Sequence, residues 1–324
     1  MSNSQIEVKV ESWPLAEPFT IARGTKTHAE VVTVSLERNG KIGRGECVPY
    51  SRYQESTESV IRQIESLPEA LDRNKLQELL PPGAARNAVD CALWDLEAKM
   101  KGKRVWEIAG LPAPQPEITA FTLSLDTPER MLAAARRHAG RPLLKIKLGT
   151  PDDMPRLEAV RKGAPRSQII IDANEGWTAE EYKELAPHLI KLGVAMVEQP
   201  LPAGEDELLA EMDRKLPVCA DESCHDRNSL PDLKGKYDMV NIKLDKTGGL
   251  TEALALRREA IQQNFEIMTG CMVGTSLAMA PAVLVAQGSA FTDLDGPLLL
   301  SEDRPFPLHF DEKGVHPPRP ELWG

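Results

Sequence analysis

The stretch LLKIKLGTPDDMPRLEAVRKGAPRSQIIIDAN (residues 143–174) decides the fold, because two short apolar runs flank a longer charged segment in it. The runs LLKIKLG (143–149) and QIIIDAN (168–174) predict parallel strands, since strands covered on both faces are almost continuously apolar. The segment between them is long enough for a crossover α-helix. The stretch therefore predicts one β-α-β unit of a parallel sheet.

Runs of the same kind occur on both sides of this unit. They are ITAFTLSL (118–125), AMVEQPL (195–201), PVCADES (217–223), MVNIKLD (239–245), FEIMTGC (265–271) and AFTDLDG (290–296). Together the eight runs recur every 22–27 residues, which is the length of one strand plus one helix. Eight such units close into a barrel. Little sequence remains for a helix after the eighth run, and the Pro-rich tail from Pro305 is expected to return to the N-terminal part.

The first hundred residues follow a different pattern, typical of a small α+β unit. Apolar and polar residues alternate over 6–10 and again over 32–36, which is the periodicity of strands. Asn39-Gly40 is a strong signal for a two-residue hairpin turn, with the return strand at 41–48. Helices are expected near 57–71 and 83–100, the second ending near Gly102.

Composition excludes several classes of function. The chain has 324 residues and a net charge of −10, which argues against a nucleic-acid partner because such binding needs a basic face. Its five cysteines are odd in number and show no CxxC spacing, as expected for reduced thiols. No run resembles a signal peptide or reaches the roughly 18 apolar residues of a membrane span. A cytoplasmic location is therefore expected.

Three acids stand at the C-terminal ends of consecutive predicted strands: Asp172, Glu198 and Asp221. Catalytic groups gather at this end of a barrel. Three clustered carboxylates repel one another unless a cation lies among them, and all-oxygen ligation favours Mg²⁺. Each acid alone could instead cap a helix that follows its strand, but three in consecutive units favour a metal site.

Lysines flank these acids. Lys145 and Lys147 lie two residues apart, so they share one face of the second barrel strand. Lys243 lies on the sixth strand, diametrically opposite in a barrel of eight. The alternative, solvated surface lysines, is weakened by their apolar neighbours.

This layout suits proton transfer next to a carboxylate. Removing such a proton gives an enediolate, whose negative charge a divalent cation stabilises. A lysine near that cation can act as the base, and a second lysine on the opposite face can return a proton. Two opposed bases of the same kind favour inversion at carbon, as in a racemase or epimerase.

The chain resembles the enolase superfamily in its muconate-lactonizing subgroup over nearly its whole length. The resemblance rests on KIK (145–147), IDAN, VEQP, ADES and NIKLDKTGG, with successive spacings of 25, 26, 23 and 22 residues from Lys147 to Lys243. It implies a (β/α)7β modified TIM barrel over 116–300 and an N-terminal α+β capping domain over 1–115. The tail, 301–324, would pack on the cap.

Within the subgroup the chain is similar to the bacterial L-Ala-D/L-Glu epimerases. The supporting segments are PFTIARG (18–24), GECVPYSRYQES (45–56), AARNAVDCALWDLEAK (84–99) and DLDGP (293–297). The resemblance implies that Asp293 and Asp295 bind the α-ammonium of a dipeptide. It also implies that a cation of the cap, Arg23 or in second place Lys26, meets the glutamate side chain; a solvated loop charge is the alternative for Arg23.

The remaining roles are also implied by the resemblance. Lys147 and Lys243 would be the two bases, with Lys145 supporting Lys147, and one Mg²⁺ per subunit would be the cofactor. Asn174 and Glu222 would position the ligands, and Cys271 and Met272 would line the substrate. The expected partner is a small dipeptide, with no nucleic acid or membrane, and a homo-oligomer is compatible with the sequence.

Other enzymes of the subgroup remain as alternatives: o-succinylbenzoate synthase, N-acylamino acid racemase and muconate cycloisomerase. Their substrates carry no free α-ammonium, so the pair Asp293 and Asp295 argues against them. A non-catalytic barrel is disfavoured by Lys147 and Lys243. The six histidines form no HxxxH or triad pattern in the sequence and receive no role.

Overall fold

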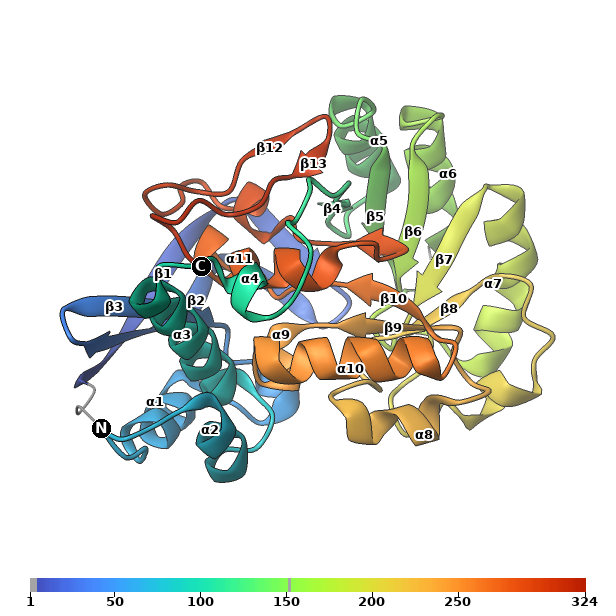
Figure 1. Cartoon of the computed structure of the whole chain (residues 1–324). Helices are drawn as coiled ribbons and strands as arrows, with labels where there is room; N and C mark the ends of the chain where they lie inside the picture. The colour runs from blue at the N-terminus through green and yellow to red at the C-terminus, as the bar shows by residue number, and fades with distance from the viewer. Residues whose placement is uncertain (1–4, 151–152) are drawn as a thin grey trace.

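A computed structural model describes residues 5–150 and 153–324 of the chain. Its N-terminal elements form a cap, and its later elements form a barrel of parallel strands (Figure 1). The sequence therefore predicted the fold class correctly.

The cap combines an antiparallel sheet with helices. Its strands are β1 (Gln5–Ile21), β2 (Gly24–Arg38) and β3 (Lys41–Cys47), and its helices are α1 (Thr57–Glu65), α2 (Arg73–Leu79), α3 (Ala84–Lys101) and α4 (Val105–Ile108), with the 3-10 turn η1 (Ser51–Tyr53). Asn39 and Gly40 both have positive φ, 52° and 71°, as a tight hairpin turn requires.

Strand β3 packs closely on helix α3, and two glycines allow this contact. A Cβ atom on Gly43 would lie 2.2 Å from the carbonyl oxygen of Ala92, and one on Gly45 would lie 2.0 Å from that of Ala88. Both glycines therefore serve the close packing of strand on helix.

One predicted helix of the cap is wrong in extent. The expected helix 57–71 ends at Glu65, and α2 is a separate helix. The break coincides with Leu67-Pro68, because the residue before a proline is driven out of the α region.

The barrel strands follow the predicted order. They are β4 (Phe121–Leu123), β5 (Leu143–Lys147), β6 (Gln168–Asp172), β7 (Val194–Glu198), β8 (Val218–Ala220), β9 (Met239–Ile242), β10 (Glu266–Thr269) and β11 (Phe291–Thr292). Each strand pairs in parallel with the next. A parallel bridge between Thr119 and Thr292 joins the two ends of the sheet, so the barrel closes.

The crossovers are less regular than the strands. They are α5 (Pro128–Arg137), α6 (Asp153–Gly163), α7 (Ala179–Lys191), η2 (Glu207–Glu211), η3 (Arg227–Ser229), α8 (Leu230–Leu233), α9 (Leu244–Thr247), α10 (Leu250–Gln262) and α11 (Ser276–Ala286). After β7 the described chain forms only the 3-10 turn η2, so the regular strand-helix alternation predicted from the sequence fails there. After β11 there is only the 3-10 turn η4 (Gly296–Leu299), and the hairpin β12 (Phe310–Asp311) and β13 (Gly314–Val315) follows.

The cap meets the barrel through buried polar side chains, which we call the seam. Asp245 Oδ1 accepts hydrogen bonds from the backbone N–H of Val48 at 3.0 Å and from Asn87 Nδ2 at 2.8 Å. Glu46 accepts from the backbone N–H of Thr275 at 2.8 Å and from Arg304 Nη2 at 2.7 Å. Because buried polar groups are costly without partners, these contacts hold the cap in one position over the barrel.

The tail lies against the cap helix α3. Trp323 Nε1 donates to the carbonyl oxygen of Cys91 at 3.0 Å, and the Gly324 N–H donates to Asp95 Oδ1 at 2.8 Å. All five cysteines are free thiols, as expected. Among the described residues, no helix has both the length and the apolar character needed to cross a membrane.

Candidate active site

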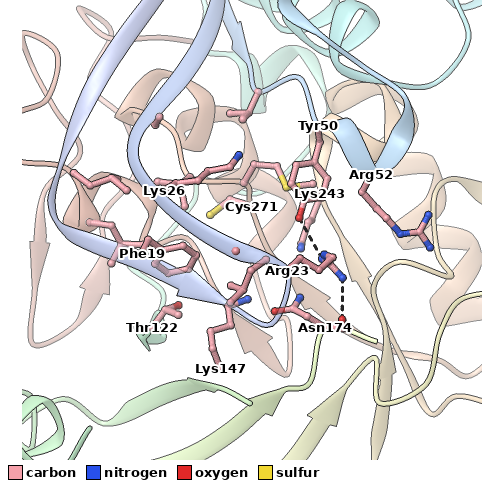
Figure 2. Close-up of a pocket in the computed structure, with 18 of the residues that line it drawn as sticks. Phe19, Arg23, Lys26, Tyr50, Arg52, Thr122, Lys147, Asn174, Lys243 and Cys271 are labelled. Atoms are coloured by element: carbon pink, nitrogen blue, oxygen red, sulfur yellow. Dashed lines mark hydrogen bonds between the residues drawn. The ribbon is translucent and has the colours of Figure 1, made fainter. Parts of the chain in front are cut away.

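A cavity of about 410 Å³ lies between the cap and the C-terminal ends of the barrel strands. Among its lining residues are nearly all of those predicted from the sequence: Arg23, Lys26, Lys145, Lys147, Asn174, Asp221, Glu222, Lys243, Cys271, Met272, Asp293 and Asp295. Asp172 and Glu198 are not among the lining residues and are fully buried. Figure 2 shows Lys147 and Lys243 extending into the cavity from different sides.

The register of the barrel sheet places the chemistry-bearing residues side by side. Lys147 pairs with Asp172 on the next strand, and Asp172 pairs with Glu198 on the strand after that. Asp221 follows β8 directly. Because successive residues of a strand point to opposite faces, this alignment directs all of these side chains to one side of the sheet.

The three acids converge. One carboxylate oxygen from each of Asp172, Glu198 and Asp221 lies within 4.8 Å of the others. Lysine ammonium groups surround them: Lys147 donates to Asp172 Oδ2 at 2.6 Å, and Lys243 donates to Asp221 Oδ2 at 2.6 Å. We call these acids, with Lys145, Lys147 and Lys243, the floor of the site.

Lys145 lies at the centre of the floor. Its Nζ is 2.6 Å from Glu198, 3.1 Å from Asp172 and 2.8 Å from Asp293. Burial alone lowers the pKa of Lys145, but the carboxylates of Asp172, Asp293 and Glu198 outweigh burial and hold it well above its ordinary value. These ion pairs make Lys145 the lysine that links the floor to Asp293.

The acids of the floor fit a divalent cation. Burial, and then the charge of neighbouring Asp172, raise the pKa of Glu198 to about 7 against the opposing effect of Lys145. Its Oε2 forms an ion pair with Lys145 but no aligned hydrogen bond. Three buried carboxylates, one of them with an oxygen that lacks a hydrogen bond, are the all-oxygen donor set that a hard divalent ion such as Mg²⁺ prefers.

Side chains beneath the floor orient these ligands, and sequence analysis did not identify them. Asn241 Nδ2 donates to Glu198 Oε1 at 2.7 Å, and Gln199 Oε1 accepts from the Asp221 N–H at 2.9 Å. Lys246, fully buried, donates to Asp221 Oδ1 at 2.6 Å. Lys246 follows Lys243 by three residues in NIKLDKTGG, so helical spacing was the available signal.

Asp293 and Asp295 form a second acidic group at the end of β11. Asp293 Oδ2 is bound by Lys145, whereas its buried Oδ1 has no hydrogen-bond partner. Asp295 Oδ2 accepts from the Thr122 N–H at 2.6 Å. Burial, and then the charge of Asp293, raise the pKa of Asp295 to about 7. A cationic group bound between the two acids would satisfy Asp293 Oδ1 and favour the charged form of Asp295.

The two cap cations differ in their surroundings. Arg23 donates to Glu222 Oε1 at 2.8 Å and to Glu175 Oε2 at 3.1 Å, and also to Tyr50 and the carbonyl oxygen of Asn174 (Figure 2). Lys26 lies over the Tyr50 ring at 5.5 Å. Within the described residues Lys26 forms no ion pair with a carboxylate.

Glu175 joins the cap to the barrel, and no pattern in the sequence marks it. It accepts from Arg52 Nη2 at 2.7 Å as well as from Arg23. Asn174 and Glu175 have left-handed backbones, with φ of 46° and 67°, a conformation unusual outside glycine. This turn carries Glu175 up from the end of β6 toward the cap.

Comparison with protein families gives two matches that together span most of the chain. Residues 4–110 match the mandelate racemase / muconate lactonizing enzyme N-terminal domain family. Residues 129–320 match the enolase C-terminal domain-like family.

Characterised relatives include two with high identity. An L-Ala-D/L-Glu epimerase from Escherichia coli (strain K12) is 48% identical over 317 residues, covering 96% of this chain and 99% of the relative. An N-acetyl-D-glutamate racemase from Pseudoalteromonas sp. is 46% identical over 288 residues, covering 87% of this chain and 91% of the relative.

A solved structure of an enolase family member from Agrobacterium tumefaciens superimposes with a TM-score of 0.97 and 54% identity, over 99% of this chain and 100% of that one. That protein has homology to dipeptide epimerases, and its structure contains sodium and L-Ala-L-Glu. A dipeptide epimerase from Cytophaga hutchinsonii, complexed with Mg and D-Ala-L-Val, has a TM-score of 0.91 at 27% identity, over 97% of this chain and 93% of that one.

Proposed function

This chain belongs to the mandelate racemase / muconate lactonizing enzyme family of the enolase superfamily, and from that premise we propose that it is a Mg²⁺-dependent dipeptide epimerase. Its substrates would be L-Ala-L-Glu and L-Ala-D-Glu, interconverted by 1,1-proton transfer at the glutamate α-carbon. The observation that carries the proposal is the pair Lys147 and Lys243 on either side of three converging acids.

Asp172, Glu198 and Asp221 would hold one Mg²⁺ per subunit. When bound, the ion supplies positive charge to the substrate carboxylate, so that removal of the α-proton is less costly. Asn241 and Lys246 keep two of the ligands in place through their hydrogen bonds. Lys147 and Lys243 would then face the α-carbon of the bound substrate from opposite sides.

The two lysines need to exchange protonation states. Burial alone lowers the pKa of Lys243, but Asp221 and Glu198 hold it well above its ordinary value. A divalent charge among these acids would offset their effect and make the neutral amine accessible at Lys243. We assign each lysine as the base for one epimer. The lysine that faces the α-proton of that epimer removes it, and the other lysine donates a proton to the opposite face.

The pair Asp293 and Asp295 selects a substrate with a free α-ammonium. The unpartnered Oδ1 of Asp293 can accept a charge-assisted hydrogen bond from the substrate ammonium. Asp295→Asn should raise KM for L-Ala-L-Glu roughly 10–100-fold, the effect of one such bond, and should spare an N-acylated substrate. Equal effects on both substrates would contradict this assignment.

For the glutamate side chain we keep Arg23 as the first candidate and Lys26 as the second. Glu222 and Glu175 already offset the charge of Arg23, whereas Lys26 is free of carboxylate contacts in the described chain. Matched variants Arg23→Met and Lys26→Met separate them, because only loss of the substrate-binding cation should raise KM for L-Ala-L-Glu without affecting L-Ala-L-Ala.

N-acylamino acid racemisation is the second candidate, and the 46% identity to an N-acetyl-D-glutamate racemase favours it. One experiment compares both: the Mg²⁺-loaded enzyme is incubated in deuterated water with a dipeptide library and with N-acetylglutamate, and deuterium uptake is measured by mass spectrometry. The proposal expects uptake at the glutamate α-carbon of L-Ala-L-Glu, with conversion to the D-epimer. Uptake into N-acetylglutamate alone would replace it by the second candidate.

The cellular setting is part of the proposal. The composition and the free thiols support a cytoplasmic enzyme, and the family resemblance supports a role in murein peptide metabolism. We also keep the division into a cap (1–115), a catalytic barrel (116–300) and a tail (301–324). The contacts of Trp323 and Gly324 with α3 support the assignment of the tail to the cap.

A further inference from the structure

The hairpin β12–β13 brings together two histidines that the sequence leaves seven residues apart. The His316 N–H donates to the carbonyl oxygen of His309 at 2.9 Å, so the two residues face each other across the hairpin. Their ring centroids are 4.7 Å apart. Asp311 lies two residues beyond His309, and its carboxylate approaches both imidazole rings. A cluster of two imidazoles and one carboxylate results.

The candidate ligand atoms are spaced for a single ion. One atom from each of His309, Asp311 and His316 lies within 4.8 Å of the others. His316 Nε2 is 2.9 Å from Asp311 Oδ1, and His309 Nε2 is 3.5 Å from Asp311 Oδ2. Zn²⁺ bonds of about 2.0–2.2 Å in tetrahedral geometry imply ligand separations of roughly 3.3 Å. The observed distances bracket that value, so small side-chain rotations suffice for binding.

A second observation concerns His316 Nε2. This atom is buried and has no aligned hydrogen bond within the described residues, although it is close to Asp311. A neutral imidazole that directs its lone pair at a carboxylate is unfavourable, and either a proton or a metal ion between them resolves the conflict.

We propose that His309, Asp311 and His316 form a binding site for a divalent transition-metal ion, with Zn²⁺ as the main candidate. Imidazole and carboxylate ligands suit Zn²⁺, whereas Mg²⁺ prefers oxygen ligands alone. The floor of the cavity and this hairpin therefore select different ions. Three protein ligands leave a fourth position for water.

The position of the hairpin gives the ion a structural role. Val315 and Glu117 form two backbone hydrogen bonds, of 2.9 and 3.0 Å, and residue 117 leads into β4 (Figure 1). The hairpin thus adjoins the N-terminal ends of the barrel strands, whereas the floor lies at their C-terminal ends. An ion bound there would join the two strands of the hairpin. It would also hold in place the point where the tail leaves the hairpin at His316, without a part in catalysis.

Histidine ¹⁵N NMR tests the site directly. Protein labelled at its histidines and saturated with Mg²⁺ is titrated with Zn²⁺, so that ions entering the floor do not affect the readout. We expect the Nε2 resonances of His309 and His316 to shift together with one equivalent. Unchanged resonances of both at millimolar Zn²⁺ would overturn the proposal, and this arm needs no variant.

Variants measure the contribution of each ligand. Asp311→Asn and His316→Gln should each lower the Zn²⁺ affinity at least tenfold, as measured by the titration of the His309 resonance. The control His188→Gln removes an exposed histidine of α7 and should leave the shift unchanged. Zn²⁺ should also raise the melting temperature of the wild type but not that of His309→Gln/His316→Gln. The proposal would be overturned if the double variant kept the Zn²⁺ affinity and the Zn²⁺-dependent rise in melting temperature. Epimerase activity should be the same in all of these variants as in the wild type.

Discussion

The floor and the seam are both buried and polar, but they are built differently. The floor residues stand on consecutive strands, and strand register alone places Lys147, Asp172 and Glu198 side by side. The seam joins residues far apart in sequence, as in the hydrogen bond between Val48 and Asp245, which are separated by 197 residues. Backbone regularity therefore places the residues of the floor, whereas contacts between residues distant in sequence hold the cap over the barrel.

The sharpest test of the floor is removal of either base. Lys147→Ala and Lys243→Ala should each lower epimerisation by about 10²–10⁴-fold or more, because general acid–base catalysis contributes that much. Each variant should still exchange the α-proton of one epimer in deuterated water, which NMR detects. Wild-type turnover in either variant, with unchanged circular dichroism, would contradict the two-base mechanism.

The largest effect expected at the seam is on stability and depends on pH. Burial, and then the nearby acids Glu55 and Glu46, raise the pKa of Asp245 from its ordinary 3.8 to about 7, although its hydrogen bonds with Val48 and Asn87 oppose this. The folded state therefore holds this proton more tightly than the unfolded chain. The stability it provides is complete below about pH 4 and is lost as the pH rises through 7, by up to about 4 kcal/mol.

Asp245→Asn isolates this effect, because the amide oxygen can still accept from Val48 and Asn87. The variant should gain stability relative to the wild type as the pH rises from 5 to 8, measured by urea unfolding. Asp232→Asn, at an exposed position of α8, is the matched control and should show no such trend. A pH-independent difference for Asp245→Asn would show that the carboxyl is ionised throughout.

Beneath the floor a smaller effect is expected. Asn241→Ala removes the donor to Glu198 Oε1 and should weaken Mg²⁺ binding about 10–100-fold, as is typical for groups that orient metal ligands. Isothermal titration calorimetry measures the affinity without substrate. Unchanged affinity would mean that the barrel backbone alone orients Glu198.

The smallest effect is expected at the partly exposed contacts of Glu175 with the cap, outside the seam. Glu175→Gln removes ion pairs with Arg23 and Arg52, whose side chains are 29% and 39% exposed. Such pairs contribute about 0.2–1 kcal/mol, so KM should change only a few-fold, and less at high salt. Lys101→Gln breaks an exposed pair with Glu97 away from the cavity and serves as the control. A change above about tenfold would place Glu175 in direct contact with substrate.

The sequence by itself determined the barrel and the residues of its floor. Apolar runs with the period of a strand plus a helix predict a parallel barrel, and acids or lysines within such runs are conspicuous. Asp172 and Lys147 could be predicted as site residues because each is a charged residue in an apolar strand run. The failures were also local: Leu67-Pro68 divided a predicted helix, and the crossover after β7 lacks an α-helix.

Only the tertiary structure decided what meets across the seam and at the hairpin. Nothing in the sequence pairs Asp245 with Asn87, directs Arg23 toward Glu222 and Glu175, or brings His309 next to His316. Periodicity reports which face of an element is buried, because burial repeats with the element's own geometry. It carries no information about which distant side chain that face will contact, since this depends on how whole elements pack.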